Sequence, residues 1–584
     1  MSIITTMTSV SATAARGSSE KADLILFNGN IATQDERRSF VSAVAIKGDR
    51  FIAVGSDREV LQHKGNDWKA IDLKGKTAIP GLNDSHMHMI RGGLLFNSEL
   101  RWDGLASLPD GLRRISDQAK RTPPGQWVRV VGSWSEFQFK ERRKPTLEEL
   151  NNAAPSVPVL VLNVYHDASL NKAALVACNY TKDTPDPVGG KFERDAQGNP
   201  TGLLVAKPSA GILYAAVAKA PKLTQPEQFN STRNFMRELN RYGITSMSDA
   251  GGGNLFYPDD YSVISQLAAQ NLLTVRTSYS LMTQRPKHEL EDYTDWSANL
   301  KPGAGNEYFR MNGAGETLVY SGADYENFVE ERPDLPTNLE GDLNAVVSLL
   351  AQRRFPFRMH ATYNESIERF LDVLEAVNEK VPFDGLRWNF DHAETISPRN
   401  IDRVRKLGGG IAIQDRMAFQ GEYFVSRHGE EAARSSPPVL KMLEAGIPVG
   451  MGTDATRVGS FNPWMSLYWL VTGKTIGGME LYPKANRVGR MEALRLYTVG
   501  SAWFSGEQEL KGSIGVGKLA DITVLSDDYF SIPEEGIRNV QSHLTIVGGK
   551  AVYAAGELTV LAPPPIPESI PTWSPTLHYP SFSG

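Results

Sequence analysis

Four histidines and one aspartate are spaced along the chain as candidate ligands of a metal ion. His86 and His88 are separated by one residue, and on an extended strand residues i and i+2 point to the same face, so both imidazoles can grip one metal ion. His360, His392 and Asp454 follow farther along, each just after an apolar run. The chain has only ten histidines among 584 residues. These types and spacings predict a metal centre of imidazole and carboxylate ligands, which suits zinc and similar divalent ions.

Alternating apolar runs and helical stretches fill residues 77–505, a pattern typical of a parallel sheet with helices outside. His360 to His392 spans about one strand–helix unit, and His392 to Asp454 spans about two. We expect eight strands, the one that carries His86 and seven that begin near Gly243, Val275, Phe309, Pro356, Leu386, Gly410 and Val449. The fold predicted is an α/β fold, a distorted (β/α)8 barrel.

The carboxyl ends of the strands of such a barrel converge on one mouth, where the candidate side chains would meet. The first, fourth, fifth, sixth and eighth strands end at candidate ligands. The predicted metal ligands are His86, His88, Glu316, His360, His392 and Asp454. For Glu316 a second interpretation is a helix-capping or solvated glutamate after a glycine-rich turn.

Both chain ends differ from the barrel in pattern. Residues 22–76 alternate apolar and polar residues as short antiparallel strands, with a hairpin turn at Gly48-Asp49, and residues 506–562 show the same pattern. Each end alone is too short for a stable sandwich, so we expect one composite β-sandwich built from both. About 155 residues separate His88 from the second barrel strand, which predicts an inserted subdomain at about 90–230. Residues 1–21 are predicted to be a disordered tail and residues 563–584 a proline-rich tail.

Composition excludes several classes of protein. A net charge of −5 over 129 charged side chains gives no strong field, so neither nucleic acid nor an anionic membrane surface is an expected partner. No run of eighteen apolar residues predicts a membrane span, and the first twenty residues lack the apolar core of a secretory signal. The single cysteine, Cys178, excludes an intrachain disulfide framework. We expect a cytoplasmic enzyme with a small-molecule substrate, and a homodimer as the default assembly.

Ordered motifs resemble those of the amidohydrolase superfamily. The segment Pro80-Gly-Leu-Asn-Asp-Ser-His-Met-His is similar to its signature PG-hydrophobic-x-D-x-H-x-H. Three later segments resemble its sixth strand, its eighth strand and its return to the sandwich: Asp391-His392-Ala-Glu, Gly452-Thr-Asp454-Ala and Gly512-Ser-Ile-Gly-Val-Gly-Lys-Leu-Ala-Asp521. Within the insert, Trp134-Ser-Glu136 and His166 followed by Asn171-Lys-Ala-Ala-Leu resemble the YtcJ-like branch, amidohydrolase family 3, which includes N-substituted formamide deformylases.

The resemblance implies a hydrolase that acts on carbon–nitrogen bonds other than peptide bonds, in an amide, an N-substituted formamide or a similar small, aromatic substrate. One or two divalent ions, with zinc expected, would supply a metal-bound hydroxide. Asp454 would act as general base and then general acid, and His392 as a ligand or an oxyanion donor. The same site also suits ester or lactone hydrolysis, deamination, decarboxylation or isomerisation. A metal-free scaffold is a further alternative, which retention of the His and Asp positions argues against.

One position departs from the branch. Its typical members carry a lysine at the end of the fourth strand, carboxylated to bridge two metals, whereas this chain reads Met311-Asn-Gly-Ala-Gly-Glu316. Either Glu316 supplies an equivalent carboxylate, or it binds substrate and leaves a site with one metal. Trp134, His166 and Arg416 are candidate substrate contacts, with ordinary packing at a domain boundary as the alternative for the first two.

Overall fold

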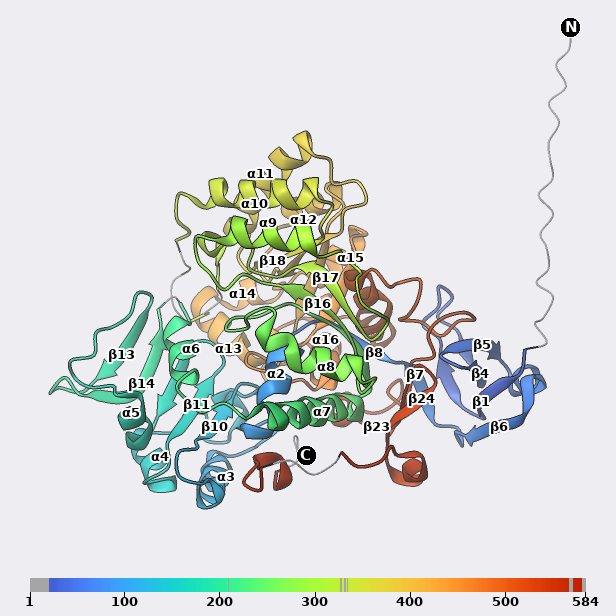
Figure 1. The fold of residues 1–584 in the computed structure, drawn as a ribbon, viewed down its shortest axis with the longest axis horizontal. Helices are drawn as coiled ribbons and strands as arrows, with labels where there is room; N and C mark the ends of the chain where they lie inside the picture. The colour runs from blue at the N-terminus through green and yellow to red at the C-terminus, as the bar shows by residue number, and fades with distance from the viewer. Residues whose placement is uncertain are drawn as a thin grey trace, which may run out of the picture.

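Eight parallel strands form the centre of the computed structural model, which describes residues 20–207, 209–325, 328–329, 332, 334–566 and 571–579. Helices lie around this barrel (Figure 1). In sheet order the strands are β8 (Leu82–Met87), β15 (Ile244–Asp249), β16 (Arg276–Leu281), β17 (Phe309–Ala314), β18 (Phe357–Ala361), β19 (Trp388–His392), β20 (Gly410–Gln414) and β21 (Val449–Gly452). All eight predicted strands are present, and the parallel barrel is confirmed.

The barrel strands are buried on both faces, which explains their continuous apolar composition. Every residue of β20, Gly-Ile-Ala-Ile-Gln, is buried, as expected for a parallel strand covered by helices on the outside. The main outer helices are α7 (Gln225–Arg241), α8 (Ser262–Ala269), α9 (Glu289–Asn299), α10 (Leu339–Gln352), α11 (Asn364–Lys380), α12 (Pro398–Lys406), α13 (Arg416–His428) and α16 (Pro463–Thr472). Local sequence sets their starts: α12 has proline as its first residue, and the Ser397 side chain accepts a hydrogen bond from the Asn400 backbone N–H.

The barrel closes along a seam between its first and last strands, β8 and β21. The Asp454 backbone N–H donates to the His86 carbonyl oxygen at 2.9 Å, just beyond the end of β21. The buried Asp84 carboxylate accepts hydrogen bonds from the Thr453 hydroxyl at 2.8 Å and the Tyr497 hydroxyl at 2.9 Å. The seam therefore joins the strand that carries the histidine pair to the segment that carries Asp454.

Strands from both chain ends share one six-stranded sheet. Its order is β24 (Lys550–Ala554), β23 (Ser542–Val547), β22 (Ile522–Leu525), β7 (Thr77–Pro80), β2 (Asn30–Ala32) and β3 (Phe40–Val41). A four-stranded sheet lies beside it, with the order β5 (Arg50–Gly55), β4 (Ala43–Lys47), β1 (Ala22–Phe27) and β6 (Lys64–Asp72). Leu26 and Val44 of the smaller sheet belong to the same buried cluster as Ile522 and Leu544 of the larger one.

The predicted hairpin at Gly48-Asp49 is confirmed, since Lys47 pairs with Arg50 across it. The expectation that the first strands are all antiparallel is wrong for one pair: β1 and β6 are parallel. The physical reason is the short helix α1 (Asp57–Val60), which follows β5 and carries the chain back to the other end of the sheet before β6 begins.

The chain between β8 and β15 forms a fourth sheet, at the left in Figure 1. Its strands are β13 (Gly190–Arg194), β14 (Pro200–Ala206), β12 (Asp167–Leu170), β11 (Val159–Asn163), β10 (Val128–Val131) and β9 (Glu99–Leu100). Alternate residues of β11 enter two separate cores: Val159 and Val161 one, Leu160 and Leu162 the other. We call this part, with α3 (Leu108–Arg121), α4 (Leu147–Ala153), α5 (Lys172–Cys178) and α6 (Gly211–Val217), the insert.

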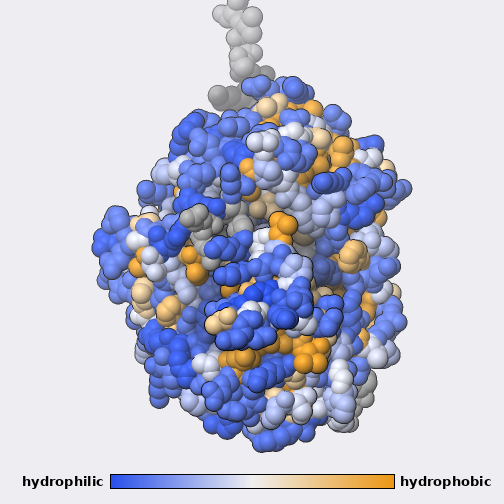
Figure 2. Space-filling view, turned by 90° about the vertical axis from the view of Figure 1, so that its left-hand side faces the viewer, coloured by the Kyte–Doolittle hydropathy of each residue, from blue (hydrophilic) through white to orange (hydrophobic). Residues whose placement is uncertain are grey.

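The last described residues, 571–579, pack against helix α3 of the insert. The Gln118 side chain donates to the Trp573 carbonyl oxygen at 2.6 Å, and the Arg114 guanidinium lies 5.2 Å from the centre of the Tyr579 ring. Of the predicted disordered tail, residues 1–19 lie outside the described residues, and the boundaries of the predicted domains stay predictions. Within the described part of the chain, no helix is both long and apolar enough to span a membrane. Figure 2 shows a face on which hydrophilic side chains predominate.

Candidate metal centre

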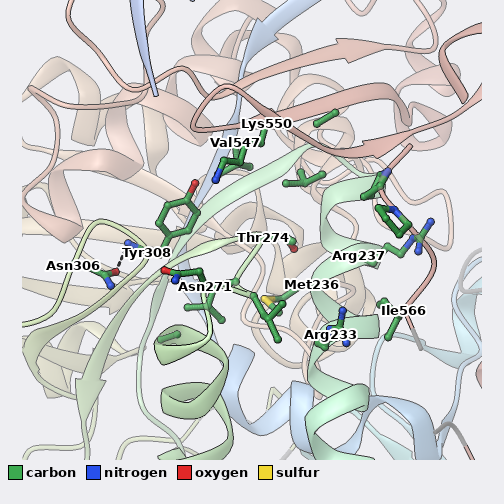
Figure 3. Close-up of a pocket in the computed structure, with 17 residues that line it drawn as sticks. Arg233, Met236, Arg237, Asn271, Thr274, Asn306, Tyr308, Val547, Lys550 and Ile566 are labelled. Carbon is green, nitrogen blue, oxygen red and sulfur yellow. Dashed lines mark hydrogen bonds between the residues drawn. The ribbon is translucent and has the colours of Figure 1, made fainter. Parts of the chain in front are cut away.

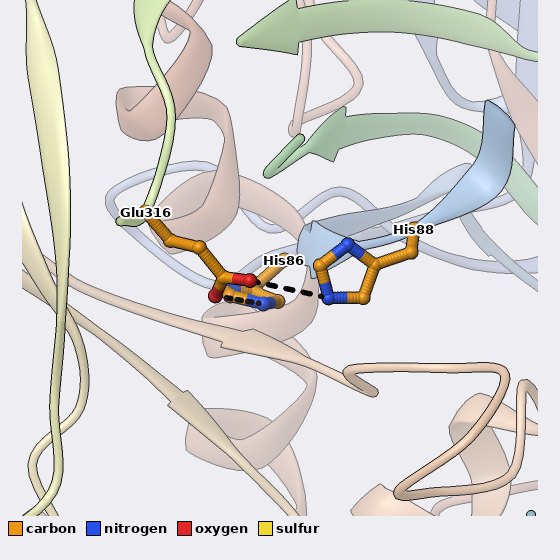
Figure 4. A group of neighbouring side chains, drawn as sticks. All are labelled: His86, His88 and Glu316. Carbon is orange, nitrogen blue, oxygen red and sulfur yellow. Dashed lines mark ion pairs between the residues drawn. The ribbon is translucent and has the colours of Figure 1, made fainter. Parts of the chain in front are cut away.

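The structure brings the six predicted metal ligands together at the mouth of the barrel. The Glu316 carboxylate faces both His86 and His88 (Figure 4): its Oε2 is 3.4 Å from His86 Nε2, and its Oε1 is 3.6 Å from His88 Nε2. Asp454 Oδ1 lies 3.0 Å from His88 Nε2 and 3.5 Å from His86 Nε2. We refer to these residues together as the mouth cluster: His86, His88, Glu316, His360, His392 and Asp454.

Three subsets of the mouth cluster each place three ligand atoms within 4.8 Å of one another. They are His86–His88–Glu316, His86–His392–Asp454 and Glu316–His360–His392. Glu316 belongs to two of the three, and its Oε2 also lies 3.8 Å from both His360 Nδ1 and His392 Nε2. A carboxylate in this position can serve two ligand sets at once.

The orientation of the histidines fits a metal. His86 Nδ1 faces the Asp391 carboxylate at 3.1 Å, and His88 Nδ1 contacts the Gly251 carbonyl oxygen. These contacts fix each ring and leave its Nε2 turned to the mouth, as in metal-binding histidines whose second nitrogen is held by an oxygen. In the described structure His86 Nε2 is fully buried and has no hydrogen-bond partner. A cation among these atoms would satisfy it.

The charges of the mouth cluster also favour a cation. Burial opposes ionisation of Glu316 and Asp454, but the histidines around them hold both carboxyl pKa values well below their ordinary range. Burial likewise opposes a charge on His86, yet the neighbouring Asp391 carboxylate raises its pKa to about 9. Burial and the charge of Arg416 lower the pKa of His392 to about 3. His392 is therefore a neutral imidazole, the form that binds metals.

Backbone strain is concentrated at the same place. His392 and Asp454 have φ values of 80° and 53°, and Ala393 has 55°, in the left-handed region that residues other than glycine rarely adopt. Such conformations cost on the order of 1–3 kcal/mol each and cluster at functional sites. Here they turn the two side chains inward at the ends of β19 and β21.

Arg416 lies at the start of α13 and is fully buried. Its Nη2 donates to Asp454 Oδ2 at 2.7 Å, and its Nη1 lies 3.4 Å from Glu394 Oε1. Arg416 thus contacts a member of the mouth cluster, and its predicted substrate-binding role stays a prediction. The arrangement holds the Asp454 carboxylate in one orientation.

The contacts of the other two predicted substrate-binding residues, Trp134 and His166, are with residues outside the mouth cluster. Trp134 is buried in a core of the insert, where its indole N–H donates to the Leu162 carbonyl oxygen at 2.8 Å. His166 is also buried: its Nδ1 is 2.7 Å from Asp167 Oδ2, and its ring packs against Tyr423 of α13 at 4.7 Å. The substrate-binding roles of both stay predictions.

An ion pair that was not predicted from the sequence orients His86. Arg358 Nε donates to Asp391 Oδ2 at 2.7 Å, both side chains are buried, and Asp391 in turn faces His86. The signal was present in the strand Phe357-Arg-Met-His, because a charged residue inside an apolar barrel strand needs a buried partner. Arg358 lies two residues before His360, on the same face of β18.

We expect Asp391→Asn to weaken metal binding about 10–100-fold, because the ring of His86 loses its charged partner. Equilibrium dialysis with the metal content of the protein as readout measures the change. The matched control is Asp521→Asn, which breaks a second buried pair, Arg276 Nε to Asp521 Oδ2 at 2.8 Å, outside the mouth cluster. Both variants lose stability, but only Asp391→Asn changes the metal affinity; equal affinities in the two would contradict the orienting role.

The motifs and the mouth cluster agree with a comparison of the whole sequence. A family model described as the amidohydrolase family matches residues 69–553, a range that includes all six residues of the mouth cluster. The chain belongs to the amidohydrolase family. The resemblance drawn from the motifs is thereby confirmed, and family membership makes the protein a hydrolase.

The similarity of this amidohydrolase to individual relatives covers nearly its whole length. It is 27% identical to an N-substituted formamide deformylase of Arthrobacter pascens, over 91% of this chain and 98% of that protein. It is 25% identical to the putative amidohydrolase YtcJ of Bacillus subtilis, over 91% of this chain and 99% of that protein. Its fold is similar to an uncharacterised metal-dependent hydrolase from Pyrococcus horikoshii, with a TM-score of 0.63 and 20% identity over 88% of this chain and 99% of that one.

Proposed function

We propose that this amidohydrolase cleaves the C–N bond of a small amide, and that N-substituted formamides are its substrate class. The observation that carries the proposal is the mouth cluster, in which four histidines and two carboxylates converge at the carboxyl ends of the barrel strands. The similarity to an N-substituted formamide deformylase over almost the full length of both chains supports the choice of bond. The reaction adds water to the formyl carbon and releases formate and an amine.

We infer that the cluster holds one or two divalent ions, with zinc the expected metal, because imidazole nitrogens combined with carboxylate oxygens are the ligands zinc prefers. A bound ion would lower the pKa of a coordinated water and polarise the substrate carbonyl. Glu316, which belongs to two ligand sets, is the candidate for the carboxylate shared between two ions. It would replace, without modification, the lysine of related chains.

Asp454 is the proposed general base and general acid. Its low pKa keeps it ionised at neutral pH, so it can accept a proton from the attacking water. Arg416 holds one oxygen, Oδ2, at 2.7 Å, while the other, Oδ1, faces His88 and the mouth. After the tetrahedral species forms, the proton on Asp454 moves to the leaving nitrogen. His392, neutral beside Arg416, serves as a ligand or donates to the developing oxyanion.

Three further features belong to the same proposal. We propose that the two sheets of the chain ends act as one β-sandwich, since their strands share a buried cluster. A homodimer is the proposed assembly, as the commonest state of soluble enzymes. The single buried cysteine fits a cytoplasmic location.

The test is a substrate screen on purified protein of known metal content. N-formyl and N-acyl aromatic amines are supplied, and release of amine and of the acid is measured. We expect turnover of the formamides, loss of turnover after chelation and recovery when zinc is returned. Metal-loaded protein that releases carbon dioxide, ammonia or an alcohol from other substrate classes, and no amine from any formamide, would overturn the proposal in favour of another reaction at this site.

A further inference from the structure

A small cavity opens between the barrel and the insert, and two of its lining residues, Arg91 and Arg457, each follow a member of the mouth cluster by three residues. Its volume is about 210 Å³. It is lined by α2 (Met89–Leu95) and the loop after β15 on the barrel side, and by β10 and the segment after α6 on the insert side. In Figure 1, α2 lies a little left of the centre, and α6 and β10 lie farther left.

The cavity is strongly basic. Four cations line it, Arg91, Arg129, Lys222 and Arg457, against a single carboxylate, Asp260. All three arginines are at least nine-tenths buried. Among the described residues, none of them forms an ion pair with a carboxylate, although a buried charge is normally paired.

Two of these arginines have unused hydrogen-bond donors. In the described structure, Arg91 Nε and Arg457 Nη1 are buried and have no hydrogen-bond partner. By contrast, Arg129 Nη2 donates to the Ser98 hydroxyl. Buried guanidinium nitrogens without partners next to a cavity indicate a site for an anion that would accept their hydrogen bonds, because leaving such donors unpaired costs free energy.

Arg91 connects the cavity to the mouth cluster. It follows His88 by three residues, and Gly252 keeps the space between them open: a Cβ at Gly252 would lie 3.2 Å from His88 Nδ1 and 3.3 Å from Arg91 Nη1. Arg91 Nη2 reaches the Tyr165 hydroxyl at 3.4 Å, and Tyr165 accepts a hydrogen bond from Tyr214 at 2.7 Å.

Arg457 completes the chain of contacts from the other side. Its guanidinium lies over the Tyr214 ring at 4.9 Å, and it follows Asp454 by three residues. The two arginines are thus joined by a pair of tyrosines, and each follows a member of the mouth cluster by three residues. Leucine and valine side chains, among them Leu94, Leu255 and Val217, form the apolar part of the lining.

We propose that this cavity binds a carboxylate carried by the substrate, so that the enzyme prefers acidic amides, with Arg91 and Arg457 as the anion-binding residues. The inference rests on the proposed function, since it adds a substrate class to the same site. A planar guanidinium matches a carboxylate in a two-point hydrogen bond, and the apolar lining matches a small organic group beside it. Fixing the acid here would hold the amide bond over the mouth cluster.

Another cavity is also lined by cations, Arg233, Arg237 and Lys550, but its two arginines are only partly buried. It measures about 440 Å³ and lies on the outside of the barrel between α7, α8 and the strands β23 and β24 (Figure 3). Arg237 lines it. Because this arginine borders a cavity but lies away from the mouth cluster, Arg237→Gln is a matched control for a change at Arg457.

The experiment compares two substrates of similar shape, N-formyl-4-aminobenzoate and its neutral amide, N-formyl-4-aminobenzamide, together with their meta isomers. We expect the wild-type kcat/KM for at least one acid to exceed that of its amide at least about tenfold. Arg457→Gln should lower this ratio at least about tenfold, Arg457→Lys should lower it less, and Arg237→Gln should leave it unchanged. A wild-type ratio near one, or a ratio that Arg457→Gln leaves intact in folded protein, would overturn the proposal.

A binding measurement separates this inference from the proposed reaction. 4-Methylbenzoate and inorganic phosphate are titrated calorimetrically into wild-type protein and both arginine variants. We expect 4-methylbenzoate to bind wild type and Arg237→Gln about equally, and Arg457→Gln at least about tenfold more weakly. Equal affinity in all three proteins, or tighter binding of phosphate, would refute a carboxylate site. Loss of all turnover with this binding pattern intact would instead refute the proposed reaction alone.

Discussion

Asp454→Asn will lower kcat about a thousandfold and leave the bound metal largely in place. Asparagine has nearly the same shape but cannot accept the proton of the attacking water, and general base catalysis contributes about 10²–10⁴-fold. Its side-chain oxygen can still accept from Arg416, which donates to Asp454 Oδ2 at 2.7 Å. Steady-state kinetics on the best formamide, with metal analysis of the same sample, measure both quantities.

The control for this substitution is Glu394→Gln. Glu394 is buried and contacts the same guanidinium at 3.4 Å, but it is not a member of the mouth cluster. If the loss at Asp454 came only from disturbing Arg416, the two variants would lose similar activity. We expect the loss in Asp454→Asn to be at least tenfold greater; a drop of less than tenfold in Asp454→Asn would remove its role as base.

Glu316→Ala will remove at least part of the bound metal and lower activity at least about a hundredfold. The reason is that Glu316 lies between two ligand sets, 3.4 Å from His86 Nε2 and 3.8 Å from His360 Nδ1, so its loss leaves each set one ligand short. Metal content after gel filtration is the measurement. A variant that keeps all its metal and shows only a raised KM would show that Glu316 binds substrate instead.

A second variant at this position tests what Glu316 replaces. The branch that the motifs resemble is expected to have, at the end of the fourth strand, a lysine that is carboxylated by carbon dioxide. Glu316→Lys should therefore recover metal and activity in part, and the recovery should depend on added bicarbonate. Glu316→Met, similar in length but unable to form a carboxylate, should recover neither.

The fold could be read from the sequence because its strands are buried on both faces and so appear as short apolar runs with regular spacing. The same regularity placed all six members of the mouth cluster, since each ends such a run. The prediction was wrong for one pair of strands. β6 runs parallel to β1 because the short helix Asp57–Val60 begins a crossover from one edge of the sheet to the other, and four residues of helix carry little weight in a pattern of alternating residues.

The roles of other site residues could not be predicted from the sequence, because each role depends on a partner that is distant in the chain. Asp391 precedes a predicted ligand, yet its role follows from Arg358 and His86, 33 and about 300 residues away. Arg91 and Arg457 stand out only once the insert folds back on the barrel and leaves their donors buried without carboxylates. Trp134 shows the opposite case: it belongs to a motif of the resembled branch, and in the structure it packs in a core of the insert.

The seam between β8 and β21 bears on how this enzyme matures. The Asp84 and Thr453 residues that join there are 369 positions apart, so nearly the whole barrel must be synthesised before its first strand can meet its last. Five of the six members of the mouth cluster, from His86 to His392, precede Thr453 in the chain, and only Asp454 follows it. An ion held by His86, His392 and Asp454 would therefore link the first strand of the barrel to the segment after the last one, and would stabilise the closed ring.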